Sequence, residues 1–89
     1  MKQRKPLLEK LDLMEEPKPR QSLVEMFANR RVIVENHRGV MDYCKDHIRV
    51  RAIGGSICIQ GEGLLIRKMC NQQLVITGSI ASIQWDRGN

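Results

Sequence analysis

The chain has 89 residues, of which 42% are hydrophobic and 28% are charged, and this is the composition of one small globular domain. Fifteen Lys and Arg residues against ten Asp and Glu residues give a net charge of +5, and only three residues are aromatic. These figures argue against a multidomain enzyme, a disordered chain and a membrane-spanning protein, because a membrane span needs about 20 consecutive apolar residues.

The sequence divides near residue 22 into two parts of different character. Before this point, apolar residues at i, i+4 and i+7 spacing predict a short amphipathic helix, and they are Leu7, Leu11 and Met14. Two prolines then end the helix and favour an extended linker. We therefore predict a helix and a Pro-containing linker over residues 1–22, and a β domain over residues 23–89. The N-terminus lacks the long apolar run of a secretory signal, so we expect a cytoplasmic protein.

From residue 23 onward the hydrophobic period is two, which is typical of strands. Short apolar segments alternate with Gly, Asn and Ser turn signals, and we predict strands at Leu23–Phe27, Val32–Asn36, Gly39–Cys44, His47–Ala52, Ser56–Gln60, Leu64–Met69, Leu74–Thr77 and Ile80–Trp85. Seven or eight short strands at this spacing predict an all-β fold. We expect a small antiparallel meander, a barrel or a domain of stacked strands, with the short helix at its N-terminus.

Two of the predicted strands share one sequence form. Ile57–Gly61 and Leu74–Gly78 both read apolar, any residue, Ile, polar, Gly. One interpretation is two similar strands that each end at a glycine bend. The other is a stacked duplication in which each glycine lets a strand turn a corner.

Four strands contain three consecutive apolar residues, at Val32–Val34, Ile57–Ile59, Leu64–Ile66 and Leu74–Ile76. Such a triplet places apolar side chains on both faces of a sheet, although a lone antiparallel sheet normally leaves one face to water. A domain of this size has little chain of its own to cover the second face. The triplets therefore favour self-association, with docking of the N-terminal helix or of another protein as the alternatives.

The residues that carry most enzyme chemistry are few. Cys44 and His47 are three residues apart, a spacing too common to indicate a nucleophile and its base, so we expect no enzyme, no catalytic residue, no small-molecule substrate and no cofactor. An odd number of cysteines indicates free thiols in a reducing compartment. Potential metal ligands exist at His37, Cys44 and His47 with Cys58 or Cys70, but the paired spacing of structural zinc sites is missing. We therefore predict no metal site.

The basic residues raise one alternative function, since small basic β-barrels bind nucleic acid. One candidate basic surface would consist of Arg49, Arg51, Arg67 and Lys68, and a second of Arg30, Arg31 and Arg38. Binding of single strands also needs aromatic side chains for stacking, and Phe27, Tyr43 and Trp85 look like core or strand-end residues. The sequence thus favours protein partners over nucleic acid.

One segment is more specific than any of these features. It runs from Val32 to Val40 as Val-Ile-Val-Glu-Asn-His-Arg-Gly-Val and is followed by Ile48–Val50, Ile57–Gly61, Leu74–Ile80 and Ile83. In these residues the chain resembles the YabP/YqfC family of sporulation proteins, in particular the YqfC branch. The similarity extends over about residues 20–85, and its most specific part is Glu35, Asn36, His37, Arg38 and Gly39.

The resemblance implies a non-enzymatic protein that acts in building the bacterial endospore. It also implies a membrane-associated sporulation protein as partner, so that the chain would lie at a membrane through that partner. No catalytic residue or cofactor comes with this family. We regard Glu35–Gly39 as a candidate interaction or turn motif. The purely structural alternative is that Gly39 supplies turn geometry while Asn36 caps its own backbone.

Overall fold

The computed structural model describes residues 21–88, so the predicted N-terminal helix lies outside the described residues. Within this range the elements are six strands, namely β1 (Leu23–Phe27), β2 (Arg31–Glu35), β3 (Val40–Tyr43), β4 (His47–Ala52), β5 (Gly55–Met69) and β6 (Gln73–Arg87). They form one sheet in the order β1-β2-β6-β5-β4-β3, and all neighbouring strands are antiparallel. The prediction of an all-β antiparallel domain is confirmed.

The expected number of seven or eight strands is not met, because four predicted strands merge into two long ones. β5 and β6 have 15 residues each, and each contains two of the predicted strands. The glycines at Gly61–Gly63 and Gly78 were expected to separate strands, but here they lie inside β5 and β6. A glycine bend thus changes the direction of a strand without ending its pairing.

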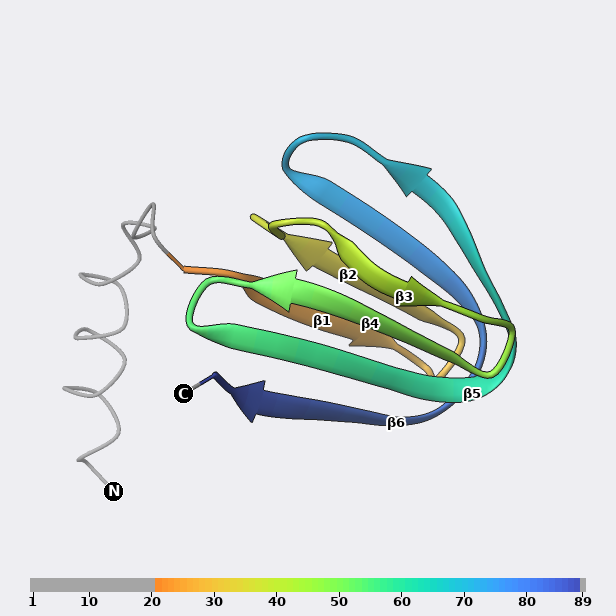
Figure 1. Ribbon diagram of the computed structural model, residues 1–89. Coiled ribbons are helices and arrows are strands. Elements are labelled where there is room, and N and C mark those ends of the chain that lie inside the picture. Colours follow the sequence, from red (N-terminus) through yellow and green to blue (C-terminus); the bar gives the residue numbers. More distant parts are fainter. Residues whose placement is uncertain (1–20, 89) are drawn as a thin grey trace, which may run out of the picture.

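The bends divide the sheet into two layers that face each other. Figure 1 shows β5 and β6 curving together round one end of the molecule. β2 pairs with residues Gln73–Thr77 of β6, whereas β4 pairs with residues Gly55–Gln60 of β5. One layer, the β2 layer, therefore contains β1, β2, the first part of β6 and the second part of β5. The other, the β4 layer, contains β3, β4, the first part of β5 and the second part of β6.

Glycine is required at the bends because two backbones approach closely there. A Cβ atom on Gly78, where φ is +143°, would lie 2.8 Å from the carbonyl oxygen of Gly63. A Cβ atom on Gly61 would overlap the carbonyl oxygen of Ser79. The two repeated segments found in the sequence hold equivalent places, since each forms the first part of a long strand and ends at its bend.

Each bend is bound by the turn of a neighbouring hairpin. At the bend of β6, the N–H of Gly78 donates to the carbonyl of Arg30 (3.1 Å), and Ile80 donates to Asn29 (2.9 Å). At the bend of β5, the N–H of Gly61 donates to the carbonyl of Asp46 (3.0 Å). The β1–β2 and β3–β4 turns therefore satisfy backbone groups that the bends leave without a ladder partner.

The core lies between the two layers and consists of eleven buried apolar residues, Val32, Val34, Ile48, Val50, Ala52, Ile57, Ile59, Leu64, Leu74, Ile76 and Ile80. Strand alternation decides how the apolar triplets divide between core and surface. Val32 and Val34 are fully buried, while Ile33 between them points to the outside of the β2 layer and is half-buried. It pairs there with Val75, the middle residue of another triplet. The two-sided apolar character expected from the triplets is therefore real on this layer.

Candidate functional site

The chain passes from one layer to the other between β2 and β3. The motif Glu35–Gly39 lies at this passage, and we call these five residues the crossover segment. Asn36 adopts a left-handed conformation with φ of +62°. Its backbone N–H donates to the carbonyl of Gln72 (2.7 Å), and its side-chain amide donates to the carbonyl of Gln21 (2.8 Å). Its carbonyl accepts from the hydroxyl of Ser22 (2.8 Å). Asn36 thus binds two other segments of the chain, and none of these bonds caps its own backbone.

His37 is the buried residue of the crossover segment, with an exposed fraction of 7%. Its Nδ1 atom accepts from the backbone N–H of Gly39 (3.0 Å). The proton of the ring therefore resides on Nε2, which donates to the carbonyl of Cys70 (2.8 Å). The ring joins the start of β3 to the end of β5, across 33 positions of sequence. Gly39 has φ of +121°, a conformation that favours glycine.

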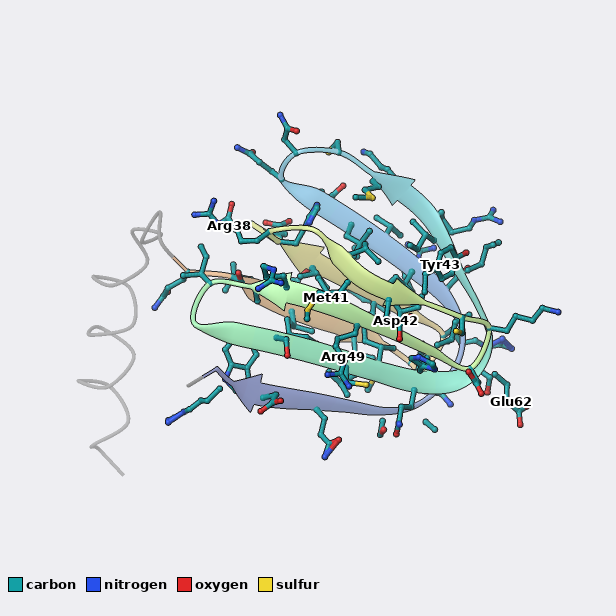
Figure 2. All side chains as sticks on the ribbon, viewed as in Figure 1. Arg38, Met41, Asp42, Tyr43, Arg49 and Glu62 are labelled. Atoms are coloured by element: carbon teal, nitrogen blue, oxygen red, sulfur yellow. The ribbon has the colours of Figure 1, made fainter. Side chains whose placement is uncertain are left out.

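The remaining residues of the crossover segment differ in exposure. The carboxylate of Glu35 accepts a long hydrogen bond from the side chain of Gln73 (3.5 Å) and is partly buried. Arg38 is exposed, and Figure 2 shows its side chain extending away from the strands. Its backbone N–H donates to the carbonyl of Arg51 (2.7 Å). Among the five residues of this motif, Arg38 is thus the one that is exposed.

Two shallow hollows lie beside the crossover segment. One is lined by His37, Arg38, Gly39, Met69, Cys70 and Asn71, and the other by Asn36, His37, Arg38, Ile53, Asn71 and Gln72. Hydrogen bonds from the backbone N–H groups of Gln72 and Gln73 lower the pKa of the Cys70 thiol. Both hollows are open to solvent, and the groups on their walls do not form an acid–base pair or a nucleophile with its base.

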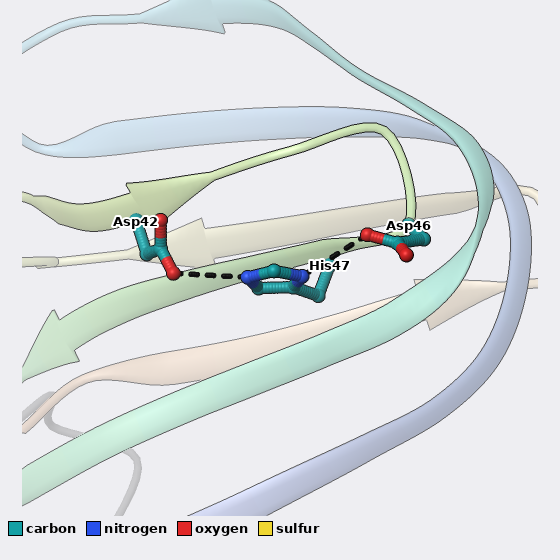
Figure 3. Close-up of polar contacts among 3 residues, drawn as sticks. All are labelled: Asp42, Asp46 and His47. Carbon is teal, nitrogen blue, oxygen red and sulfur yellow. Dashed lines mark hydrogen bonds and ion pairs between the residues drawn. The ribbon is translucent and has the colours of Figure 1, made fainter.

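A second polar cluster lies on the β3–β4 hairpin and is drawn in Figure 3. The His47 ring is placed between two carboxylates, with Nε2 at 2.9 Å from Asp42 Oδ2 and Nδ1 at 3.1 Å from Asp46 Oδ1. These two hydrogen bonds raise the pKa of His47 above its ordinary value, and the bond to Asp42 has the larger effect. The hydrogen bond between Asp42 and His47 also lowers the pKa of Asp42. Both aspartates are exposed and His47 is partly exposed, so these contacts contribute little to the stability of the fold.

Cys44 completes this cluster. One donor atom from each of Asp42, Cys44 and His47 lies within 4.8 Å of the other two. The structure thus brings together Cys44 and His47 from the ligands considered in the sequence, while His37, Cys58 and Cys70 are not members of this group. Asp42 was missed. Its signal was strand alternation, which places Asp42 and Cys44 on the same face of one strand.

The exposed apolar residues follow a simple rule. Among residues 21–88, eight large apolar side chains are exposed, and they are Leu23, Met26, Phe27, Met41, Tyr43, Leu65, Met69 and Trp85. All of them lie on strand segments that pair on one side only, namely β1, β3, the second part of β5 and the second part of β6. Within the part of the chain that the structure describes, the unpaired edges of the sheet therefore also carry its large exposed apolar side chains.

The outer face of the β4 layer is polar instead. Arg49 lies opposite Asp42 on the neighbouring strand, and Figure 2 shows both side chains on this face. Tyr43 points the other way, since its hydroxyl accepts from the backbone N–H of Ile66 (3.0 Å) in the β2 layer. Trp85 lies opposite the buried Ile57, and Phe27 belongs to β1. The face that carries Arg49 and Arg51 thus has none of the three aromatic residues of the chain.

A family model described as the YabP family matches residues 18–89, a range that includes all six strands and the crossover segment. No curated protein and no solved structure matches the chain. Within residues 21–88, there is no helix of the length and hydrophobicity that crossing a membrane requires.

Proposed function

Because the chain belongs to the YabP family, we propose that it acts in sporulation by assembling with other copies of itself, without catalysing a reaction. The motif Glu35–Gly39 further supports a place in the YqfC branch of this family. We assign the protein to the cytoplasm of the sporulating cell, at a membrane where a membrane-associated partner holds it there.

The observation that carries this proposal is the coincidence of free strand edges with exposed apolar side chains. An unpaired edge offers a row of backbone N–H and C=O groups to another strand. Soluble proteins usually protect such edges with charges, bulges or short strands. Here β3 contains a bulge between Val40 and Asp42, and the second part of β5 contains further register shifts. These two edges are thus partly protected.

The other two edges are regular. β1 pairs with β2 over Leu23–Phe27 without a register shift. The second part of β6 likewise pairs with β5 over Ser82–Arg87 without a register shift. Each carries an exposed aromatic residue, Phe27 at 46% and Trp85 at 49% exposure. A second copy of this chain is the partner we favour, because it offers an edge of the same length and the same apolar character. We therefore propose that β1 and the end of β6 are the edges through which copies assemble.

The test is the oligomeric state of the full chain in solution, measured by sedimentation velocity over a range of concentrations. We expect reversible association of the wild type. Phe27→Lys and Trp85→Lys should weaken it at least about tenfold, equivalent to 1.4 kcal/mol, because a charge would be buried at the new contact. Gln84→Lys is the matched control, since Gln84 is the sequence neighbour of Trp85 but points to the polar outer face.

A chain that stays monomeric at the highest concentration at which it is soluble would contradict the proposal. So would equal loss of association in Gln84→Lys and Trp85→Lys. The nucleic-acid alternative is tested separately with single-stranded nucleic acid on a solid support. Salt-dependent retention that is lost in Arg49→Gln/Arg51→Gln, but kept in Arg30→Gln/Arg31→Gln, would favour that alternative.

A further inference from the structure

The β3–β4 hairpin holds three different metal-binding groups on one face. Its turn is short, and the backbone N–H of Cys44 donates to the carbonyl of His47 (2.8 Å), which places these two residues directly opposite each other. Side chains of directly opposed residues lie on the same face with Cβ atoms about 4.5–5.5 Å apart. Asp42 precedes Cys44 by two residues and therefore shares this face.

The positions of the donor atoms suit a small metal ion. In a tetrahedral zinc site the bonds are about 2.0–2.3 Å long, so that the ligand atoms lie about 3.3–3.8 Å apart. Here the donor atoms of the three residues lie within 4.8 Å of one another, and Nε2 of His47 is 2.9 Å from Asp42 Oδ2. Changes of about 1 Å or less, within reach of small side-chain rotations, convert this arrangement into a coordination site.

The surrounding residues also orient the histidine for this role. Asp46 accepts from Nδ1 of His47, which leaves Nε2, the nitrogen beside Asp42, for a metal ion. A carboxylate behind the non-ligating nitrogen is the usual second partner of a zinc-binding histidine. His37 contrasts with this, since both its ring nitrogens are engaged by backbone groups and the ring is buried.

We propose that the β3–β4 hairpin binds one zinc-like divalent ion through the thiolate of Cys44, Nε2 of His47 and the carboxylate of Asp42. The fourth position of the ion faces solvent. A thiolate and an imidazole together select zinc and similar ions, whereas Mg²⁺ and Ca²⁺ prefer oxygen donors alone. Binding releases two protons into solvent, the thiol proton of Cys44 and the proton that Nε2 of His47 shares with Asp42, because a metal ion takes a thiolate and a neutral imidazole as ligands. This proposal departs from the absence of a metal site expected from the sequence, where only cysteine and histidine spacing was considered.

The experiment uses the full chain without an affinity tag, in the presence of a non-thiol reductant, titrated with Co²⁺ as a spectroscopic substitute for Zn²⁺. We expect binding of one ion per chain and a near-ultraviolet charge-transfer band from the thiolate. Cys44→Ser should abolish this band, and Cys70→Ser, which removes another exposed thiol, should keep it. His47→Gln and Asp42→Asn should weaken binding while the thiolate band persists at higher Co²⁺ concentration.

Asp46→Asn provides a finer test, since it removes the orienting group and leaves every ligand in place. We expect its affinity for Co²⁺ to fall by about 10–100-fold with the shape of the spectrum retained. Unfolding curves of each variant in the absence of metal show whether the hairpin remains folded. Absence of a thiolate band in the folded wild type, or a band that survives Cys44→Ser, would overturn the proposal.

Discussion

At the scale of single residues, the two histidines show how position in the fold decides their environment. His47 is partly exposed on a hairpin between two aspartates, and both raise its pKa. We predict that Asp42→Asn lowers the pKa of His47 toward the ordinary value, because it removes the larger of the two contributions. NMR titration of the ring protons, with a chelator present, measures this shift. Asp46→Asn should give a smaller decrease, and an unchanged pKa in Asp42→Asn would contradict the prediction.

His37, by contrast, is buried and holds backbone groups of two segments. We predict that His37→Ala lowers the free energy of unfolding by about 1–3 kcal/mol, because it leaves the carbonyl of Cys70 and the N–H of Gly39 without their partner. Urea unfolding curves measure this loss. His47→Ala, the same substitution at the partly exposed histidine, should shift the midpoint much less. Equal effects at the two positions would show that the crossover segment does not depend on His37.

Sequence reasoning placed the motif Glu35–Gly39 in a turn but did not identify its contacts. The partner of His37 is a carbonyl 33 positions away, and the partners of Asn36 lie near residues 21 and 72. No local pattern encodes such distant backbone contacts. The contact between Asp42 and His47 was easier to predict from the sequence, since strand alternation and a short turn put both residues on one face.

At the scale of elements, the glycine bends decide the shape of the sheet. We predict that Gly61→Ala and Gly78→Ala each cost more than about 2 kcal/mol of stability, because a Cβ atom at either position meets the backbone of the opposite strand. Thermal or urea unfolding measures this cost. Gly54→Ala is the control, because φ there is +90° but the space is open, so that only the conformational penalty of about 1–2 kcal/mol applies. A larger effect at Gly54 than at the two bends would contradict this account.

The positions of the strands followed from the sequence to a large extent. β1, β2, β3 and β4 lie where period-two patterns and turn residues predicted them. The length of β5 and β6 was not predicted, because a glycine can mark either a turn that ends a strand or a bend within it. Which of the two occurs depends on whether the neighbouring strand continues alongside. β5 and β6 continue side by side through their bends, so they remain paired on both sides of the glycines.

At the scale of the whole molecule, the division of isoleucines between core and surface is the feature to test. We predict that Ile76→Ala, at a fully buried position, costs about 2–5 kcal/mol, whereas Ile33→Ala, on the outside of the same layer, costs about 1 kcal/mol. Urea unfolding at a dilution where the chain is monomeric measures both. Similar costs would mean that the outer face of the β2 layer is covered within the monomer.

The sequence by itself determined that this is a small all-β protein with more apolar surface than one sheet can bury, because alternation and composition are local properties. It also carried the motif that points to its family, and the family model confirms the YabP assignment. Only the tertiary structure decided which apolar residues are left at free edges and which polar residues meet on the β3–β4 hairpin. These outcomes depend on pairing between strands far apart in the chain, and on bends that place β6 between β2 and β5. The small size of the chain first suggested assembly in general terms, and the fold now directs attention to two edges, β1 and the end of β6.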